Sequence, residues 1–196
     1  LNNLPVNEQW NYTLGGTWKR FFDNSNLFVV LSRSHLNNTA VKYADYADIT
    51  SPKLIDYESQ EIENKSRIEY NFRESNIKFN VGLSLEDATY LNSTNRLLTV
   101  GDSIYTKRVE TDLHFIKYGA FAQLSKTYLV DRLVTSIGFR VDGNSFTENT
   151  TTPNFSPRLS LAYNLSGKSS LNANLGRYYQ LPEYTILAFG INNNFQ

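Results

Sequence analysis

A strict alternation of apolar and polar residues near the C-terminus constrains the fold more than any other feature of the sequence. Between residues 158 and 176, every second side chain is apolar and the side chains between are polar or small. A period of two places these sets on opposite faces of a β-strand. Turn residues interrupt the alternation at 166–169, where Gly167 can adopt a positive φ. The segment is therefore predicted to be a β-hairpin with one apolar face: Leu159, Leu161, Tyr163, Leu165, Leu171, Ala173 and Leu175.

The same alternation recurs along the whole chain and predicts about eight strands. Short turns and long loops alternate between them, and no segment with a period of 3.6 residues interrupts the pattern. Parallel pairing would need long crossovers, so the fold class is predicted to be all-β, an antiparallel up-and-down meander. The expected strands lie at about 8–21, 27–36, 58–73, 77–86, 110–124, 133–142, 158–165 and 170–176. The expected long loops lie at about 37–57, 87–108 and 143–155.

Composition removes several classes of protein. The 196 residues carry a formal net charge of zero and contain no basic block. The sequence therefore lacks the cluster of basic residues that a nucleic-acid-binding protein normally has. No cysteine is present, so disulfides and thiolate metal sites are excluded. His35 and His114 lack ligand spacing, and no phosphate loop, nucleophile elbow or catalytic triad is recognisable. We therefore expect neither an enzyme nor a metal or cofactor site.

The apolar face could point into a dry core or out into lipid, and alternation alone does not decide between them. A soluble barrel packs its apolar face inward, whereas a membrane barrel turns it outward and lines its lumen with polar residues. The chain has unequal rims of short and long connections, charged residues deep within strands, and aromatic residues such as Trp10 and Phe21 near strand ends. These features favour a transmembrane barrel.

Several motifs in the second half of the chain resemble one family of membrane barrels. They are YGAFAQ at 118–123, DRL at 131–133, GFRVD at 138–142, SPRL at 156–159 and GRYYQLP at 176–182. In this order and spacing they resemble the barrel of TonB-dependent outer-membrane receptors, and the Asn- and Tyr-rich style resembles Bacteroidetes members. The resemblance is specific from about Tyr118 to Pro182.

The resemblance implies a bacterial outer-membrane barrel of about 22 strands with a plugged lumen. Such receptors import scarce nutrients, often iron chelates, cobalamin or glycans, with energy transmitted by TonB. Residues 1–196 are then expected to be one segment of the barrel, without the plug domain or the TonB box. The implied partners are outer-membrane lipid, the remaining barrel and plug, TonB through the missing N-terminal region, and an unidentified small nutrient; no nucleic acid is expected.

A second interpretation is a complete small barrel of eight strands, either an outer-membrane adhesion-type protein or a lipocalin-like carrier. The interpretations differ at the first and last strands, which pair in a closed barrel but remain open edges in a segment.

Candidate substrate-binding residues are those expected on the lumen face, since binding comes from long loops and lumen side chains. Arg140, Arg158 and Tyr178 are the three candidates; the alternative is that they only line a water-filled wall. The charged series Glu61, Glu63, Lys65, Arg67 and Glu69 is likewise either a lumen ladder or a hydrated strand face, depending on its cross-strand partners.

Overall fold

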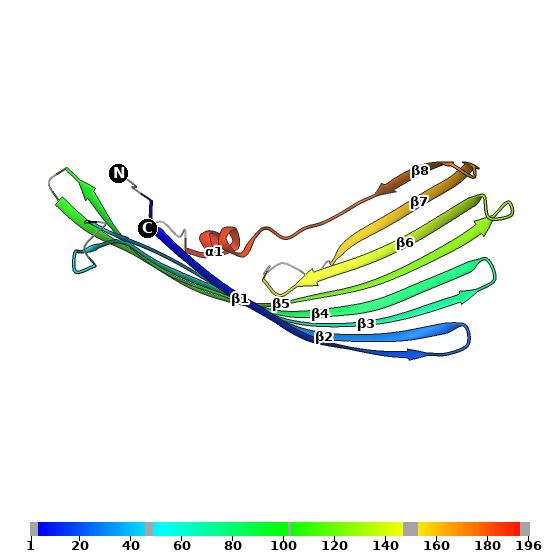
Figure 1. The fold of residues 1–196 in the computed structure, drawn as a ribbon, viewed down its shortest axis with the longest axis horizontal. Helices are drawn as coiled ribbons and strands as arrows, with labels where there is room; N and C mark the ends of the chain where they lie inside the picture. The colour runs from blue at the N-terminus through cyan, green and yellow to red at the C-terminus, as the bar shows by residue number, and fades with distance from the viewer. Residues whose placement is uncertain (1–3, 46–48, 102, 147–152, 193–196) are drawn as a thin grey trace.

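One antiparallel sheet organises the computed structural model, which describes residues 4–45, 49–101, 103–146 and 153–192. Its eight strands follow one another in sequence order, each hydrogen-bonded to the next (Figure 1). The predicted meander is confirmed. The strands are β1 (Val6–Phe21), β2 (Ser25–Tyr43), β3 (Lys53–Glu74), β4 (Ile77–Val100), β5 (Ser103–Tyr128), β6 (Leu133–Asn144), β7 (Asn154–Ser166) and β8 (Ser169–Gly176).

The sheet is curved and its two edges stay open. A short helix, α1 (Tyr184–Asn192), follows β8 and lies on the concave side of the sheet (Figure 1). Within the described residues, β1 pairs only with β2 and β8 only with β7. The small closed barrel considered above would need β1 to pair with β8, so the sheet fits a segment of a larger barrel instead.

The two faces of the sheet differ in polarity as the alternation predicts. Large apolar side chains project into solvent on the convex face; Leu83 is 59% exposed and Leu85 is 51% exposed. They do not converge on a dry core, which agrees with an outward-facing apolar surface. We call this surface the apolar band. Its exposed members include Leu14, Trp18, Leu31, Ile68, Tyr70, Leu83, Leu85, Ile116, Tyr118, Leu124, Ile137, Phe139, Leu159, Leu161, Leu171 and Leu175.

Two of the three predicted long loops are largely wrong. Residues 87–100 and 103–108 continue β4 and β5 as one paired hairpin, in which Gly101 takes a positive φ of 61° at the tip. The loop expected at 37–57 shrinks to the connection between Tyr43 and Lys53. Strand pairing here extends beyond the apolar band, where both faces of a strand can be polar and the alternation that reveals a strand is lost.

The third predicted loop, at 143–155, is close to the connection between β6 and β7, of which the structure describes part. The opposite rim has the short connections 22–24, 75–76, 129–132 and 167–168. The two rims therefore remain unequal, because β2–β3 and β4–β5 extend much farther on one side than the short turns on the other.

A small apolar cluster joins α1 to the sheet. Ala88 and Tyr90 of β4 and Leu113 and Phe115 of β5 are buried together with side chains of the helix. This helix was not predicted, since it follows Pro182 and lies outside the strand pattern. None of the helical residues that the structure describes forms a span long and apolar enough to cross a membrane. The helical members of the cluster are Leu187 and Ala188, and Phe146, Leu181 and Tyr184 pack against it.

Candidate functional site

Charged residues on the concave face form pairs along single strands. Residues two apart share a face, so a cation and a carboxylate at i and i+2 lie side by side. Lys65 Nζ lies 2.5 Å from Glu63 Oε2, and the Arg67 guanidinium forms an ion pair with Glu69. These are members of the charged series that the sequence placed on the polar face of this strand.

Pairing across strands joins part of this series into a network. Lys117 of β5 forms an ion pair with Glu86 of β4, and its Nζ lies 3.7 Å from Glu63 Oε1. Lys65 Nζ also lies 4.0 Å from Glu86 Oε2. The cross-strand partners that the charged ladder needs are therefore present on β3, β4 and β5.

Tyr184 of α1 connects the helix to this network. Its hydroxyl donates to Glu63 Oε1 and lies 3.3 Å from Glu86 Oε1, and it accepts a 2.7 Å hydrogen bond from Lys117 Nζ. Burial and the adjacent Glu63 carboxylate raise the pKa of the Tyr184 hydroxyl above its ordinary value. The phenol therefore stays protonated and serves as donor to two carboxylates. We call Glu63, Lys65, Glu86, Lys117 and Tyr184 the Tyr184 cluster.

Glu61, on the same face of β3 as Glu63, lies near two other carboxylates, those of Glu63 and Glu183. Burial, and then the nearby charges of Glu63 and Glu183, raise the pKa of Glu61 above 4.5. The shift disfavours the ionised form of Glu61 near the start of α1. The sheet near α1 thus contains oppositely charged pairs, such as Lys117 with Glu86, and also like charges that repel one another around Glu61.

A cavity of about 540 Å³ lies beside the Tyr184 cluster on the concave face. Strands β3 to β7 contribute to its wall, and residues 179–181 close one side of it. The Arg140 guanidinium lines it and makes hydrogen bonds of 2.6–2.9 Å to the Asp142 carboxylate. Gly119 leaves room for this pair, because a Cβ there would lie 2.6 Å from Asp142 Oδ1. Its charged lining side chains are Lys65, Arg67, Glu86, Lys117, Arg140 and Asp142.

The structure places the three predicted lumen residues in two neighbouring positions. Arg158 stacks over the ring of Tyr178, with its guanidinium carbon 4.7 Å from the ring centroid. Arg140 lies on the adjacent strand, paired with Asp142. Arg140 lines the cavity, whereas Arg158 and Tyr178 are not among its lining residues.

Sequence reasoning missed three members of the Tyr184 cluster as site residues. Glu86 and Lys117 occupy polar positions in alternating strands, but only the register that pairs them directly reveals their contact. Tyr184 lies outside every strand, and no local pattern indicates its partners.

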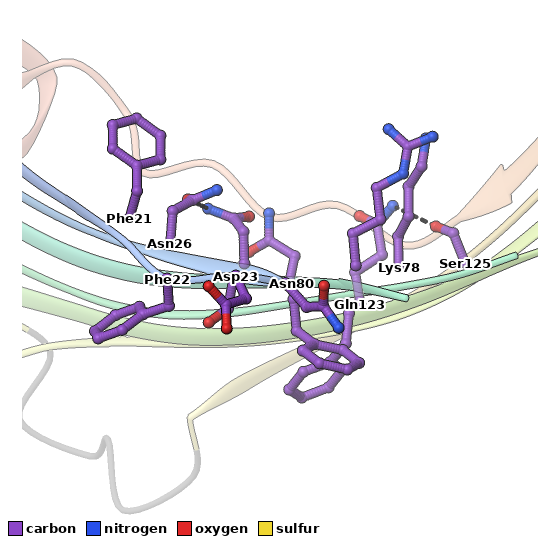
Figure 2. Close-up of a pocket in the computed structure, with 14 residues that line it drawn as sticks. Phe21, Phe22, Asp23, Asn26, Lys78, Asn80, Gln123 and Ser125 are labelled. Carbon is purple, nitrogen blue, oxygen red and sulfur yellow. Dashed lines mark hydrogen bonds between the residues drawn. The ribbon is translucent and has the colours of Figure 1, made fainter. Parts of the chain in front are cut away.

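An amide-rich cavity of about 540 Å³ lies at the rim formed by the short turns. Figure 2 shows Asn26, Asn80, Gln123 and Ser125 projecting from neighbouring strands, with the aromatic rings of Phe21 and Phe22 beside them. Asn71 Nδ2 donates a 3.1 Å hydrogen bond to Asn26 Oδ1. Amides offer both donors and acceptors without charge, which suits contact with another polar protein surface.

The two histidines lie in different environments. The His35 ring packs against Trp10 and Tyr12, with centroid distances of 4.7 and 5.6 Å. His114 Nε2 lies 2.6 Å from Asp87 Oδ1. No group of three or more potential metal ligands occurs in the part of the chain that the structure describes.

Comparisons with known proteins agree with this architecture. A family model described as "TonB dependent receptor-like, beta-barrel" matches residues 2–196. Among solved structures, "Copper transporter OprC" superposes with a TM-score of 0.66 at 14% identity, a likeness of fold alone. The match covers 89% of this chain and 30% of that transporter chain. A search of curated proteins found no match.

Proposed function

Since this chain belongs to the TonB-dependent receptor-like β-barrel family, we propose that it forms part of the wall of a receptor that imports a scarce nutrient across the bacterial outer membrane. The exposed apolar band carries this proposal. A face with Leu83 and Leu85 more than half exposed is costly in water and favourable against hydrocarbon. On β4 the band covers residues 77–86, which matches the roughly 9–11 residues that a tilted strand needs to span a bilayer.

The concave face then lines the lumen of the complete receptor. Several of its cations are balanced by carboxylates, in the pairs of Lys65 with Glu63, Arg67 with Glu69, and Arg140 with Asp142. A wall balanced in this way holds water and polar surfaces without a strong net field. The open edges at β1 and β8 are covered by the remaining strands of the same barrel.

The family and the concave surface support the partners that we propose. The amide-rich cavity at the short-turn rim, including Asn26, Asn80 and Gln123, is a surface on which the plug of the complete receptor packs. TonB engages the N-terminal part of the receptor and supplies the energy for import. Transport, rather than catalysis, is the activity of the assembled protein.

Arg140, Arg158 and Tyr178 are proposed to contact the nutrient during its passage. Arg140 lines the charged cavity beside the Tyr184 cluster, and the Arg158–Tyr178 stack offers a cation and an aromatic ring. Iron chelates, cobalamin and glycans are the candidate substrates. A guanidinium can bind a carboxylate or phosphate group of a chelate, and a tyrosine can pack against a sugar ring.

Uptake by the full-length receptor tests this function. Cells that express it are supplied in turn with a ferric chelate, cobalamin or an oligosaccharide as the limiting nutrient, in strains with and without TonB. The proposal predicts receptor-dependent growth on one of them, and loss of that growth without TonB. Growth that is equal in both strains would contradict it.

A further inference from the structure

The convex face contains a hollow of about 530 Å³ that differs from the rest of the apolar band. Apolar side chains of Leu14, Leu31 and Leu85 contribute to its lining. Gly16 and Ser66 leave space between them, and a Cβ added to Gly16 would meet nothing within 4 Å. One end is polar, where the hollow is lined by Arg33, Asn64 and Asp87.

The polar end belongs to a hydrogen-bonded chain across five strands. Arg33 donates from Nε to the Tyr12 hydroxyl over 3.1 Å and from Nη1 to Asn64 Oδ1 over 2.8 Å. Asn64 Nδ2 donates to Asp87 Oδ2 over 3.2 Å, and Asp87 Oδ1 lies 2.6 Å from His114 Nε2. Strand register places Arg33, Asn64 and Asp87 in one row, two residues along their strands from Leu31, Ser66 and Leu85; Leu14 of β1 and Ile116 of β5 flank this row. The row is therefore bordered by residues of the apolar band.

Arg33 is a cation without a counter-ion in this row. Among the described residues no carboxylate lies within 4.0 Å of its guanidinium, and Nη2 has no protein acceptor. Several cations of the concave face, including Lys65, Arg67 and Arg140, have carboxylate partners. A charge beside hydrocarbon needs a partner, and on a lipid-facing surface that partner comes from the lipid.

We propose that this hollow binds one phosphate-bearing membrane lipid. An acyl chain lies over Gly16 and Ser66 between the leucines, and the headgroup phosphate accepts hydrogen bonds from Arg33 and neutralises it. Such a lipid matches the site because its acyl chain can lie against the apolar lining while its anionic phosphate reaches the Arg33 guanidinium. This inference rests on the proposed function, which places the convex face in a membrane.

Lipid titration of the full-length receptor in a neutral detergent, followed by native mass spectrometry, tests the site. The probes are dioleoyl phosphatidylglycerol, dioleoyl phosphatidylcholine and inorganic phosphate. We expect the first bound phosphatidylglycerol to be preferred over phosphatidylcholine, and inorganic phosphate not to displace it. Arg33→Gln should weaken phosphatidylglycerol binding about tenfold and remove the preference.

Two further variants separate the parts of the site. Gly16→Leu adds an apolar side chain at a position where a Cβ meets nothing within 4 Å, and it should weaken the binding of both lipids by occupying the hollow. Arg108→Gln removes a guanidinium beyond the band that is already paired with Glu110, and should change nothing. Unchanged phosphatidylglycerol preference in Arg33→Gln, or equal binding of both lipids by the wild type, would overturn the site. A spin label at position 83 in the same preparation, tested for contact with lipid, examines the proposed function separately.

Discussion

At the scale of single residues, Tyr184 links α1 to the sheet through hydrogen bonds with Glu63, Glu86 and Lys117. Tyr184→Phe removes a donor to Glu63 and Glu86 and an acceptor for Lys117, while the ring can keep its edge contact with Phe115. Losing a hydrogen bond to a charged group costs about 1.5 kcal/mol, so amide exchange of α1 in the full-length receptor should accelerate about tenfold. Hydrogen exchange with mass spectrometry measures this.

Tyr179→Phe is the matched control for that change, since Tyr179 contacts Arg177 through its ring. Its α1 exchange should equal that of the wild type. Equal protection of α1 in Tyr184→Phe and the wild type would show that the apolar cluster alone holds the helix.

Glu61 gives the docking of α1 a dependence on pH. Its pKa is raised by burial and by the Glu63 and Glu183 charges, so the docked state favours protonated Glu61. Docking is therefore strengthened below the raised pKa and weakened as pH rises through it. After correction for intrinsic exchange, α1 should be better protected near the ordinary pKa of a glutamate, about 4.3, than at about pH 7.5, and Glu61→Gln should reduce the difference. A difference that persists in full in Glu61→Gln would assign it to other groups.

Alternation was enough to place Arg140 and Arg158 on the polar, concave face, because parity alone decides the face of a strand residue. It could not find the Tyr184 cluster. The contact between Glu86 and Lys117 depends on register across two strands, and Tyr184 reaches them from a helix 98 residues beyond Glu86 in the chain.

At the scale of elements, β4 shows how different the cost of one substitution is on the two faces. Leu83→Arg places a guanidinium on the apolar band and should destabilise the folded protein in phospholipid vesicles by about 2–4 kcal/mol. Ser84→Arg, one residue along on the concave face, should cost less than about 1 kcal/mol, because lumen positions stay hydrated. Urea titration of the vesicle-inserted receptor compares the two, and equal costs would argue against opposite environments for the two faces.

The hairpin of β4 and β5 extends well beyond the apolar band. Its outer part, residues 92–111, should be dispensable for assembly because the spanning residues 77–86 and 117–126 remain paired without it. Replacing 92–111 with a two-residue Asn-Gly turn, which joins the paired residues Leu91 and Asp112, should leave heat-modifiable migration and outer-membrane recovery unchanged. Loss of the folded form in this variant would mean that the extension is needed to set strand register.

This hairpin also shows why the long loops were predicted wrongly. Alternation marks a strand only where one face is apolar, and Asn92, Ser93, Thr94, Asn95 and Arg96 offer no apolar set. A polar loop and a strand pair with both faces in water have the same residue composition, so the sequence does not distinguish them. The eight strands within the band were identifiable; their extensions were not.

At the scale of the whole molecule, the two faces of the sheet suit two different solvents, lipid and water. The convex face is apolar over the band, the concave face carries balanced ion pairs and amides, and both edges are open to neighbouring strands. Fold class and orientation followed from residue pattern, because lipid and water impose opposite choices on alternate positions. Substrate identity does not follow in the same way, since it depends on side chains brought together by the complete barrel.

Site-directed spin labelling along 77–86 of the full-length receptor in bilayers tests the central claim most directly. The chain has no cysteine of its own, so each introduced cysteine is unique within it. Labels at the odd positions, such as Leu83→Cys and Leu85→Cys, should collide readily with oxygen dissolved in lipid. Labels at the even positions, such as Ser84→Cys, should show low oxygen contact, giving a period of two. High oxygen contact at the even positions, or no alternation at all, would contradict a wall whose convex face meets lipid.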